Sequence, residues 1–205
     1  MPRRRPRRGP GNALAALLSA GNVGCVQGAG TIRNIHIGEF IDASGVVLEL
    51  RGRRRDDVLL ELIDHIPALG ERPADRQRLF AALQEREDLC STSVGDGVAI
   101  PHARNALVGL VDRPVIVFGR KAEGLPFGSM DGSLVRLFFL VVAPTVTLHL
   151  QTLARLSRLL RNPHVRQGLL AAETISRILS LVRVTEIELD PPPTVDCFLS
   201  LVELL

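Results

Sequence analysis

The sequence from residue 91 to residue 105 reads Ser91-Thr92-Ser93-Val94-Gly95-Asp96-Gly97-Val98-Ala99-Ile100-Pro101-His102-Ala103-Arg104-Asn105. Two glycines, Gly95 and Gly97, allow the backbone to turn sharply or to approach another group closely. Pro101 fixes its own φ near about −65° and favours an extended conformation for Ile100. His102 follows this stiff segment directly, so we expect its side chain to point in a well-defined direction. A lone Pro-His pair is typical of a polar loop between core elements, and only the wider pattern points to chemistry.

The whole segment resembles the phosphohistidine loop of the enzyme IIA (EIIA) components of the bacterial phosphotransferase system, in the mannitol/fructose/nitrogen-regulatory (type 2) family. That family's pattern reads Arg-Glu, a few residues, then Ser-Thr-Gly-x-Gly-x-Gly-[Ile/Val]-Ala-[Ile/Val]-Pro-His. Here Arg86-Glu87 precede the loop, and order, spacing and residue types agree from Arg86 through His102. Ser93 stands where the family usually has glycine, which puts the first turn of the loop in question.

The resemblance implies roles for three side chains. His102 takes the position of the phosphorylated histidine, His149 that of the second active-site histidine, and Arg86 that of the active-site arginine. A neutral imidazole can attack phosphorus with one ring nitrogen while a hydrogen bond holds the other. A guanidinium group matches the oxygens of a phosphoryl group. In isolation, Arg86 is typical of a surface salt bridge to Glu87 or Asp88, and His149 of a partly exposed helical residue.

Ser91, Thr92 and Arg104 are further candidates, as donors to the phosphate or to its partners. We expect no cofactor and no metal site, because the sequence has neither a Gly-Lys-Ser/Thr phosphate-binding loop nor an HExxH motif. The three cysteines are widely spaced and form no CxxC pair, which indicates neither a disulfide framework nor a zinc site and suits a reducing compartment: Cys25, Cys90 and Cys197.

Strands and helices alternate on both sides of this loop. Apolar runs predict strands at 46–50, 113–119 and 135–143, the last of them a buried central strand. Helical spacing and capping residues predict helices at 56–66, 73–86, 145–161, 163–171 and 174–183, the third capped by Thr145 or Thr147. Residues 124–132 are rich in turn formers. The predicted fold class is therefore α/β, a single domain with one mixed sheet of about five strands flanked by helices on both faces. The resemblance covers residues 36–188 and implies the same fold.

Composition narrows the classes of function. The 205 residues include no tryptophan or tyrosine and only 3% aromatic residues, so platforms for stacking bases are scarce and we expect no nucleic-acid partner. The net charge is +3, but residues 1–38 contain six arginines and no acid, so the remainder carries −3, the difference between +3 and +6. No apolar stretch approaches the ~18–20 residues that span a bilayer, and we expect no membrane insertion.

The two ends of the chain differ from the middle. Residues 1–30 predict a disordered basic N-terminal extension, broken by prolines. Their order of basic, apolar and small residues also permits a secretory signal, and a start codon assigned too far upstream is a further alternative. Residues 189–205 predict a proline-rich C-terminal tail. The prediction for the protein as a whole is a cytoplasmic location.

The resemblance predicts a nitrogen-regulatory EIIA that accepts a phosphoryl group from a histidine phosphocarrier protein (HPr-like) on His102 and either relays it or signals by its phosphorylation state. A sugar-specific EIIA of fructose or mannitol type, which donates to a cysteine of an EIIB partner, is one alternative. A regulator that binds kinases or transporters without transferring phosphate is another. The presence of Arg86, His102 and His149 together favours transfer.

Overall fold

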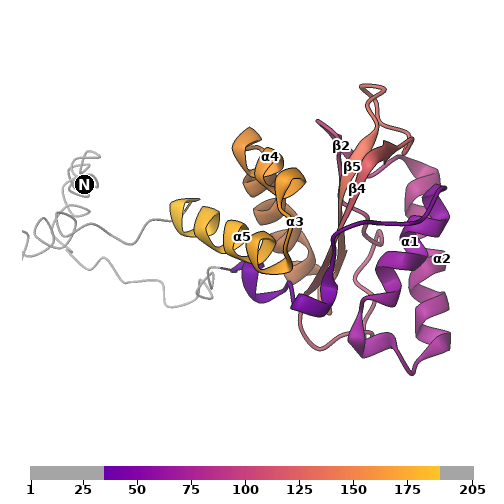
Figure 1. Cartoon of the computed structure of the whole chain (residues 1–205). Helices are drawn as coiled ribbons and strands as arrows, with labels where there is room; N and C mark the ends of the chain where they lie inside the picture. Colours follow the sequence, from indigo (N-terminus) through magenta and orange to yellow (C-terminus); the bar gives the residue numbers. More distant parts are fainter. Residues whose placement is uncertain (1–34, 190–205) are drawn as a thin grey trace, which may run out of the picture. The chain divides into compact units, whose positions relative to one another are not determined.

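The computed structural model describes residues 35–189, which form a mixed five-stranded sheet between two layers of helices (Figure 1). The strand order is β1-β4-β5-β3-β2. This arrangement confirms the predicted α/β fold class. The predicted N-terminal extension (1–30) and all but the first residue of the predicted C-terminal tail (189–205) lie outside the described residues.

The sheet is built around two long antiparallel strands, β4 (Val115–Leu125) and β5 (Val135–Val142). The short edge strand β1 (Val46–Val47) pairs in parallel with β4. On the other side, β3 (Val98–Ala99) pairs in parallel with β5, and β2 (Ser93–Gly95) pairs antiparallel with β3. The loop singled out in the sequence is therefore a β-hairpin at the second edge of the sheet.

Side chains of β5 alternate between two apolar cores. Phe138, Leu140 and Val142 belong to the core beneath α1 (Arg55–Asp64) and α2 (Pro73–Leu89). Leu137, Phe139 and Val141 belong to the core on the opposite face. A strand that is covered on both faces needs a continuous apolar run rather than an alternating one, which is what the sequence of β5 provides.

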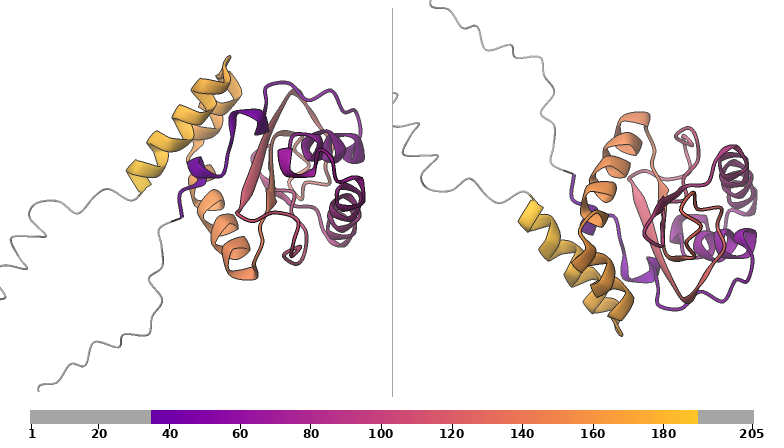
Figure 2. Two further views of the ribbon diagram at one scale, coloured as in Figure 1. Left: turned by 90° about the horizontal axis from the view of Figure 1, so that it is seen from below. Right: turned by 90° about the horizontal axis from the view of Figure 1, so that it is seen from above.

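The second face is covered by three helices, which lie on the opposite side of the sheet from α1 and α2 in both views of Figure 2. They are α3 (Val146–Leu160), α4 (Pro163–Ala171) and α5 (Ile175–Leu189). Three short 3₁₀ turns complete the fold: η1 (Ile37–Glu39), η2 (Ala43–Gly45) and η3 (Pro67–Leu69). Thr145 caps α3, because its side chain accepts the N–H of Leu148.

The predicted strand 113–119 is too short, since β4 continues to Leu125. Gly119 does not end the strand. It leaves room for the side chains of Leu50 and Leu62, whose methyl carbons would lie 2.7 and 2.8 Å from a Cβ at that position. The polar segment that follows still pairs with β5, and within it Lys121 is buried, with Nζ donating to the carbonyl of Leu50 at 3.2 Å.

Other boundaries also differ from the predictions. The first strand is shorter than the apolar run 46–50, although Leu50 N–H still donates to the carbonyl of Arg120 at 2.7 Å. Helix α2 extends three residues past 86, and α5 extends six residues past 183. Within residues 35–189, no helix combines the length and the apolar character needed to cross a membrane.

Candidate active site

The backbone around His102 is held by hydrogen bonds to the two chain segments that lie on either side of it in the sheet. On one side, Ile100 N–H donates to the carbonyl of Thr92 at 3.1 Å. On the other, the carbonyl of Pro101 accepts the N–H of Val141 at 2.9 Å, and His102 forms a parallel bridge with Val141 at the end of β5. Pro101 has no backbone N–H and cannot donate a hydrogen bond. The segment before His102 is therefore held by the N–H of Ile100 and the carbonyl of Pro101.

The imidazole of His102 has a defined tautomer. Its Nδ1 lies 2.7 Å from the backbone oxygen of Ile100. A carbonyl oxygen can only accept, so Nδ1 carries the proton and Nε2 keeps its lone pair. Burial lowers the pKa of His102, and the charge of Arg86 lowers it further, while the hydrogen bond to Ile100 opposes both. The pKa of His102 is therefore below its usual value, so the ring is uncharged near pH 7, a state in which Nε2 can act as a nucleophile.

His149 faces His102 from the first turns of α3. The two ring centroids are 5.4 Å apart, with 52° between the ring planes. His149 is only 5% exposed. Burial lowers its pKa, and the neighbouring His102 lowers it further. Two neutral imidazoles therefore lie side by side, although their residues are 47 positions apart in the sequence.

Arg86 lies in the last turn of α2 and is half-buried. One of its guanidinium nitrogens donates to the carbonyl of Cys90 at 2.6 Å. The alternative salt bridges do not form, because Asp88 pairs with Arg55 at 2.9 Å and Glu87 points into the hairpin. Arg86 is near enough to His102 for its charge to lower the pKa of that ring. The structure thus brings all three predicted site residues to one region.

The three weaker candidates are placed differently. Ser91 uses its hydroxyl to donate to the carbonyl of Phe127 at 2.5 Å, and Thr92 uses its hydroxyl to donate to the carboxylate of Glu87. Arg104 is exposed and makes no hydrogen bond or ion pair within residues 35–189. Ser93 fits in β2 with its hydroxyl donating to the carbonyl of Val98 at 3.2 Å, so the serine in place of glycine leaves the hairpin intact.

Glu87 is buried beside the hairpin, a placement that the sequence analysis did not predict. It is 6% exposed, although a carboxylate at a helix C-terminus faces the negative end of the helix dipole. Burial raises the pKa of Glu87, while hydrogen bonds from the hydroxyl and the N–H of Thr92 oppose that shift. The available signal was its fixed place directly after Arg86 in the family pattern.

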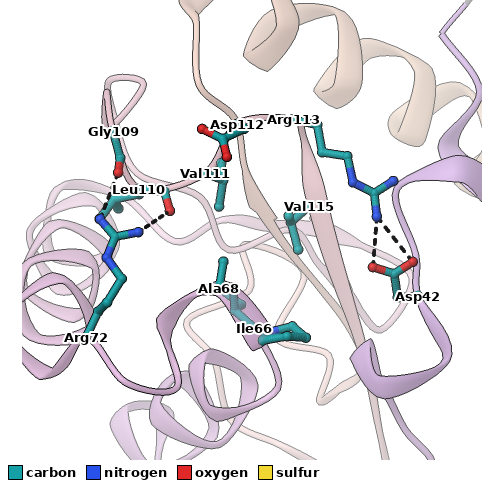
Figure 3. Close-up of a pocket in the computed structure, with 11 residues that line it drawn as sticks. Asp42, Ile66, Ala68, Arg72, Gly109, Leu110, Val111, Asp112, Arg113 and Val115 are labelled. Carbon is teal, nitrogen blue, oxygen red and sulfur yellow. Dashed lines mark hydrogen bonds and ion pairs between the residues drawn. The ribbon is translucent and has the colours of Figure 1, made fainter.

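A pocket of about 440 Å³ lies next to the loop that follows His102 (Figure 3). Its two arginines lie on opposite sides and are already engaged. Arg72 donates to the carbonyls of Gly109 and Leu110 at 2.9 and 3.1 Å, and Arg113 pairs with Asp42 at 3.0 Å. Because both guanidinium groups are bound to other groups of the protein, the pocket offers little positive charge to an anionic ligand.

Comparison with known proteins assigns the family. Residues 39–184 match the sequence model of the family described as "Phosphoenolpyruvate-dependent sugar phosphotransferase system, EIIA 2". This chain belongs to that EIIA family. The match includes the hairpin, both histidines and Arg86.

Relatives of this EIIA chain carry two kinds of name. It is 33% identical over 148 residues to the fructose-specific EIIABC component of Bacillus subtilis, covering 71% of this chain and 23% of that protein. It is 41% identical over 102 residues to the fructose-specific EIIA component of Haloferax volcanii, covering 49% of this chain and 64% of that protein. A nitrogen regulatory protein of Bradyrhizobium diazoefficiens is 35% identical over 122 residues, covering 58% of this chain and 74% of that protein. The matches thus span less than two thirds of the two fructose-specific relatives.

Solved structures share the fold of this EIIA chain. Nitrogen regulatory protein IIA-Ntr from Neisseria meningitidis superposes with a TM-score of 0.60 at 28% identity, covering 71% of this chain and 98% of that one. The mannitol IIA of Escherichia coli superposes with a TM-score of 0.58 at 21% identity, covering 69% and 97%, which shows a common fold.

Proposed function

We propose that this protein accepts a phosphoryl group on Nε2 of His102 from a histidine phosphocarrier protein. The observation that carries the proposal is the hydrogen bond from Nδ1 to the oxygen of Ile100. It leaves Nε2 unprotonated in a ring whose pKa is already lowered by burial. A nucleophile in this state needs no general base, because there is no proton to remove from the attacking atom.

In the proposed step, the lone pair of Nε2 forms a bond to phosphorus as the bond between phosphorus and the donor histidine nitrogen breaks. The leaving nitrogen keeps that electron pair. The transferring group is close to metaphosphate, with negative charge spread over three oxygens. Arg86 supplies fixed positive charge beside the site, and His149 supplies a ring N–H that can donate to one of those oxygens. Groups of this kind stabilise charge that develops in the transition state.

Exposed apolar side chains next to these polar residues support docking of a protein partner. Val146 and Leu150 are each 60% exposed and share a face of α3 with His149, at positions i, i+4 and i+3. Leu89 is 61% exposed, three residues after Arg86. Apolar area beside reactive polar groups is typical of a protein interface.

The proposed downstream role is nitrogen-regulatory. Its support is the coverage of 98% of the Neisseria meningitidis IIA-Ntr chain, together with the nitrogen regulatory relative from Bradyrhizobium diazoefficiens. The fructose-specific relatives favour a second candidate, in which His102 passes the phosphoryl group to a cysteine of an EIIB partner. A solved complex of the Escherichia coli mannitol IIA with its phosphorylated IIB is the precedent for such a pair.

Phosphorylation by a reconstituted cascade tests the proposal. The full chain is incubated with phosphoenolpyruvate, the first enzyme of the cascade and an HPr-like phosphocarrier. We expect one acid-labile phosphoryl group per chain, and none on His102→Ala. If His102→Ala is still labelled and His149→Ala is not, the roles of the two histidines are reversed. Addition of a purified fructose-type EIIB then separates the branches, since only a sugar-specific EIIA transfers its label rapidly to that cysteine.

A further inference from the structure

The carboxylate of Glu87 is buried beside the hairpin and binds a single residue, Thr92. Its Oε2 accepts the N–H of Thr92 at 2.9 Å, and its Oε1 accepts the hydroxyl of the same residue. Glu87 thus holds both donors of one threonine. The carboxylate is buried at the unfavourable end of a helix, where burial raises its pKa. Burial of a carboxylate costs free energy unless hydrogen bonds compensate it, and here both of those bonds come from Thr92.

From Thr92 the contacts continue to the reactive ring. The carbonyl of Thr92 accepts the N–H of Ile100 at 3.1 Å, and the carbonyl of Ile100 accepts Nδ1–H of His102 at 2.7 Å. Three links therefore connect Glu87 to the imidazole: carboxylate to Thr92, Thr92 to Ile100, and Ile100 to His102. The last link is the one that determines which ring nitrogen carries the proton.

We propose that Glu87 is a positioning residue for His102, which holds Thr92 so that the Ile100 carbonyl is aimed at Nδ1 and Nε2 stays free to react. This inference rests on the proposed function for its effect on rate, but not for its effect on the ring. The pKa of His102 is shifted by burial, by the Ile100 carbonyl and by Arg86, and Glu87 is not among these causes. Glu87 therefore acts through geometry rather than through its charge.

The adjacent residues Arg86 and Glu87 then have separate tasks. The side chain of Arg86 extends from the last turn of α2, donates to the carbonyl of Cys90, and lies near enough to His102 for its charge to lower the pKa of that ring. Glu87 points from the same turn into the hairpin. An Arg-Glu pair at the end of this helix would thus be needed for two separate reasons: the charge of Arg86 and the hydrogen bonds of Glu87 to Thr92.

The test reads the tautomer of His102 by long-range ¹H–¹⁵N NMR in the unphosphorylated full chain. We expect the Nδ1–H tautomer in the wild-type protein and a mixture enriched in Nε2–H in Glu87→Ala. Glu87→Gln should restore the wild-type tautomer, because its amide oxygen can accept from the Thr92 N–H and its NH₂ can donate to the Thr92 hydroxyl oxygen. Glu85→Ala, an exposed position on the same helix, is the matched control and should change nothing.

Rates of phosphoryl acceptance provide the second readout. The rate constant for Glu87→Ala should fall about 100-fold, the cost expected for a misplaced reacting group, whereas Glu87→Gln should stay close to wild type. A merely structural role would lower thermal stability without moving the tautomer. Thr92→Val, which replaces the hydroxyl with a methyl group, should shift the tautomer in the same direction and serves if Glu87→Ala does not fold.

The two proposals fail in different ways. If the folded Glu87→Ala and Thr92→Val variants keep the wild-type Nδ1–H tautomer, the positioning role of Glu87 is wrong even where His102 is phosphorylated. If the tautomer shifts as expected but the wild-type chain accepts no phosphate from the cascade, Glu87 positions the ring and the proposed phosphotransfer is wrong.

Discussion

At the scale of single residues, opposing effects set the state of His102. The hydrogen bond to the Ile100 carbonyl favours the protonated ring, whereas burial and the charge of Arg86 favour the neutral one. Burial is the largest of these effects, so the pKa is lowered while the tautomer is still determined by Ile100. His149 is shifted in the same direction by burial and by His102. The site thus contains two neutral imidazoles beside one fixed cation.

The first prediction concerns pH. Because its folded pKa is lowered below ~6.5, His102 should remain an unprotonated nucleophile at pH values where an ordinary histidine is already charged. The rate of phosphoryl acceptance should therefore stay constant as pH falls through ~6.5 and decline only below it. The lowered pKa values of His102 and His149 also make the free energy of unfolding depend on pH. Their contribution to stability is fully present above ~6.5, the pKa of histidine in the unfolded chain, and is lost as the pH falls through the folded pKa values. An NMR titration of both rings and rapid-quench rates test this. A titration midpoint at or above the ordinary histidine value would contradict it.

The second prediction separates the roles of His149 and Arg86. If both stabilise charge that develops during transfer, their loss should slow the reaction more than it reduces labelling at long times. His149→Ala should still accept phosphate slowly and should donate it poorly to a cognate partner. Arg86→Ala should slow both directions by about 10²–10³-fold. Rapid-quench measurements in each direction test this, with Arg78→Ala, an exposed arginine on the same helix, as control. Wild-type donation by the His149 variant would mean that this residue is structural.

The sequence predicted three polar residues that the structure brings together, but not the contacts that hold them. His102, Arg86 and His149 were found because each has a characteristic residue type at a characteristic place in a family pattern. The partner of Nδ1 is a backbone carbonyl, and every residue has one, so no letter of the sequence marks it. Thr92 was a candidate donor to the phosphate or to its partners, and in the structure its hydroxyl donates to Glu87. Hydroxyl groups find local partners during folding that spacing alone does not reveal.

At the scale of elements, the β2–β3 hairpin delivers His102 to the site. Gly95, Asp96 and Gly97 all have positive φ, at 86°, 53° and 73°. Three consecutive left-handed residues reverse the chain within a very short turn. The carbonyl of Gly97 then accepts the N–H groups of Arg136 and Leu137 at 2.8 and 3.0 Å, which fixes the hairpin to β5. The glycines are thus required by the turn itself.

The third prediction compares two glycines with similar backbones. Gly97→Ala should destabilise the fold by more than the ~1–2 kcal/mol expected for a left-handed non-glycine residue, because its Cβ would lie 3.3 Å from the Leu134 carbonyl oxygen. Gly109 has φ of 82° and nothing within 4 Å of a Cβ, so Gly109→Ala should show the backbone cost alone. Urea denaturation of both variants gives the difference in free energy of unfolding. Equal losses would show that the contact with Leu134 relaxes freely.

Elements with continuous apolar runs or clear caps were predicted well, and elements that depend on partners were not. β5 and the Thr145 cap of α3 are examples of the first kind. β2 and β3 have few residues each and exist because β5 offers a free edge, a long-range condition that local sequence does not contain. The polar half of β4 is held by the same kind of pairing, with Arg120 opposite Leu137.

At the scale of the whole molecule, one buried carboxylate connects the two ends of the described chain. Glu186 in α5 is 3% exposed and accepts the N–H groups of Ile37 and Gly38 at 2.5 and 2.8 Å. These residues begin η1, whose first N–H groups have no partner within the turn. The guanidinium of Arg155 lies 3.5 Å from the same carboxylate. Glu186 therefore joins residues almost 150 positions apart, and so attaches η1 to α5 at the core between the sheet and α3, α4 and α5.

The fourth prediction tests this attachment. Glu186→Ala leaves two buried N–H groups without their acceptor, at a cost of about 1–3 kcal/mol for each. Glu186→Gln keeps one acceptor oxygen and should be intermediate. Glu188→Ala, two residues away and exposed, should unfold like the wild type because alanine suits a helix and no contact is lost. Chemical denaturation measures these free energies, and hydrogen exchange at Ile37 and Gly38 should accelerate only in the Glu186 variants. A Glu186→Ala variant as stable as Glu188→Ala would mean that water replaces the carboxylate and that η1 stays attached to α5 without it.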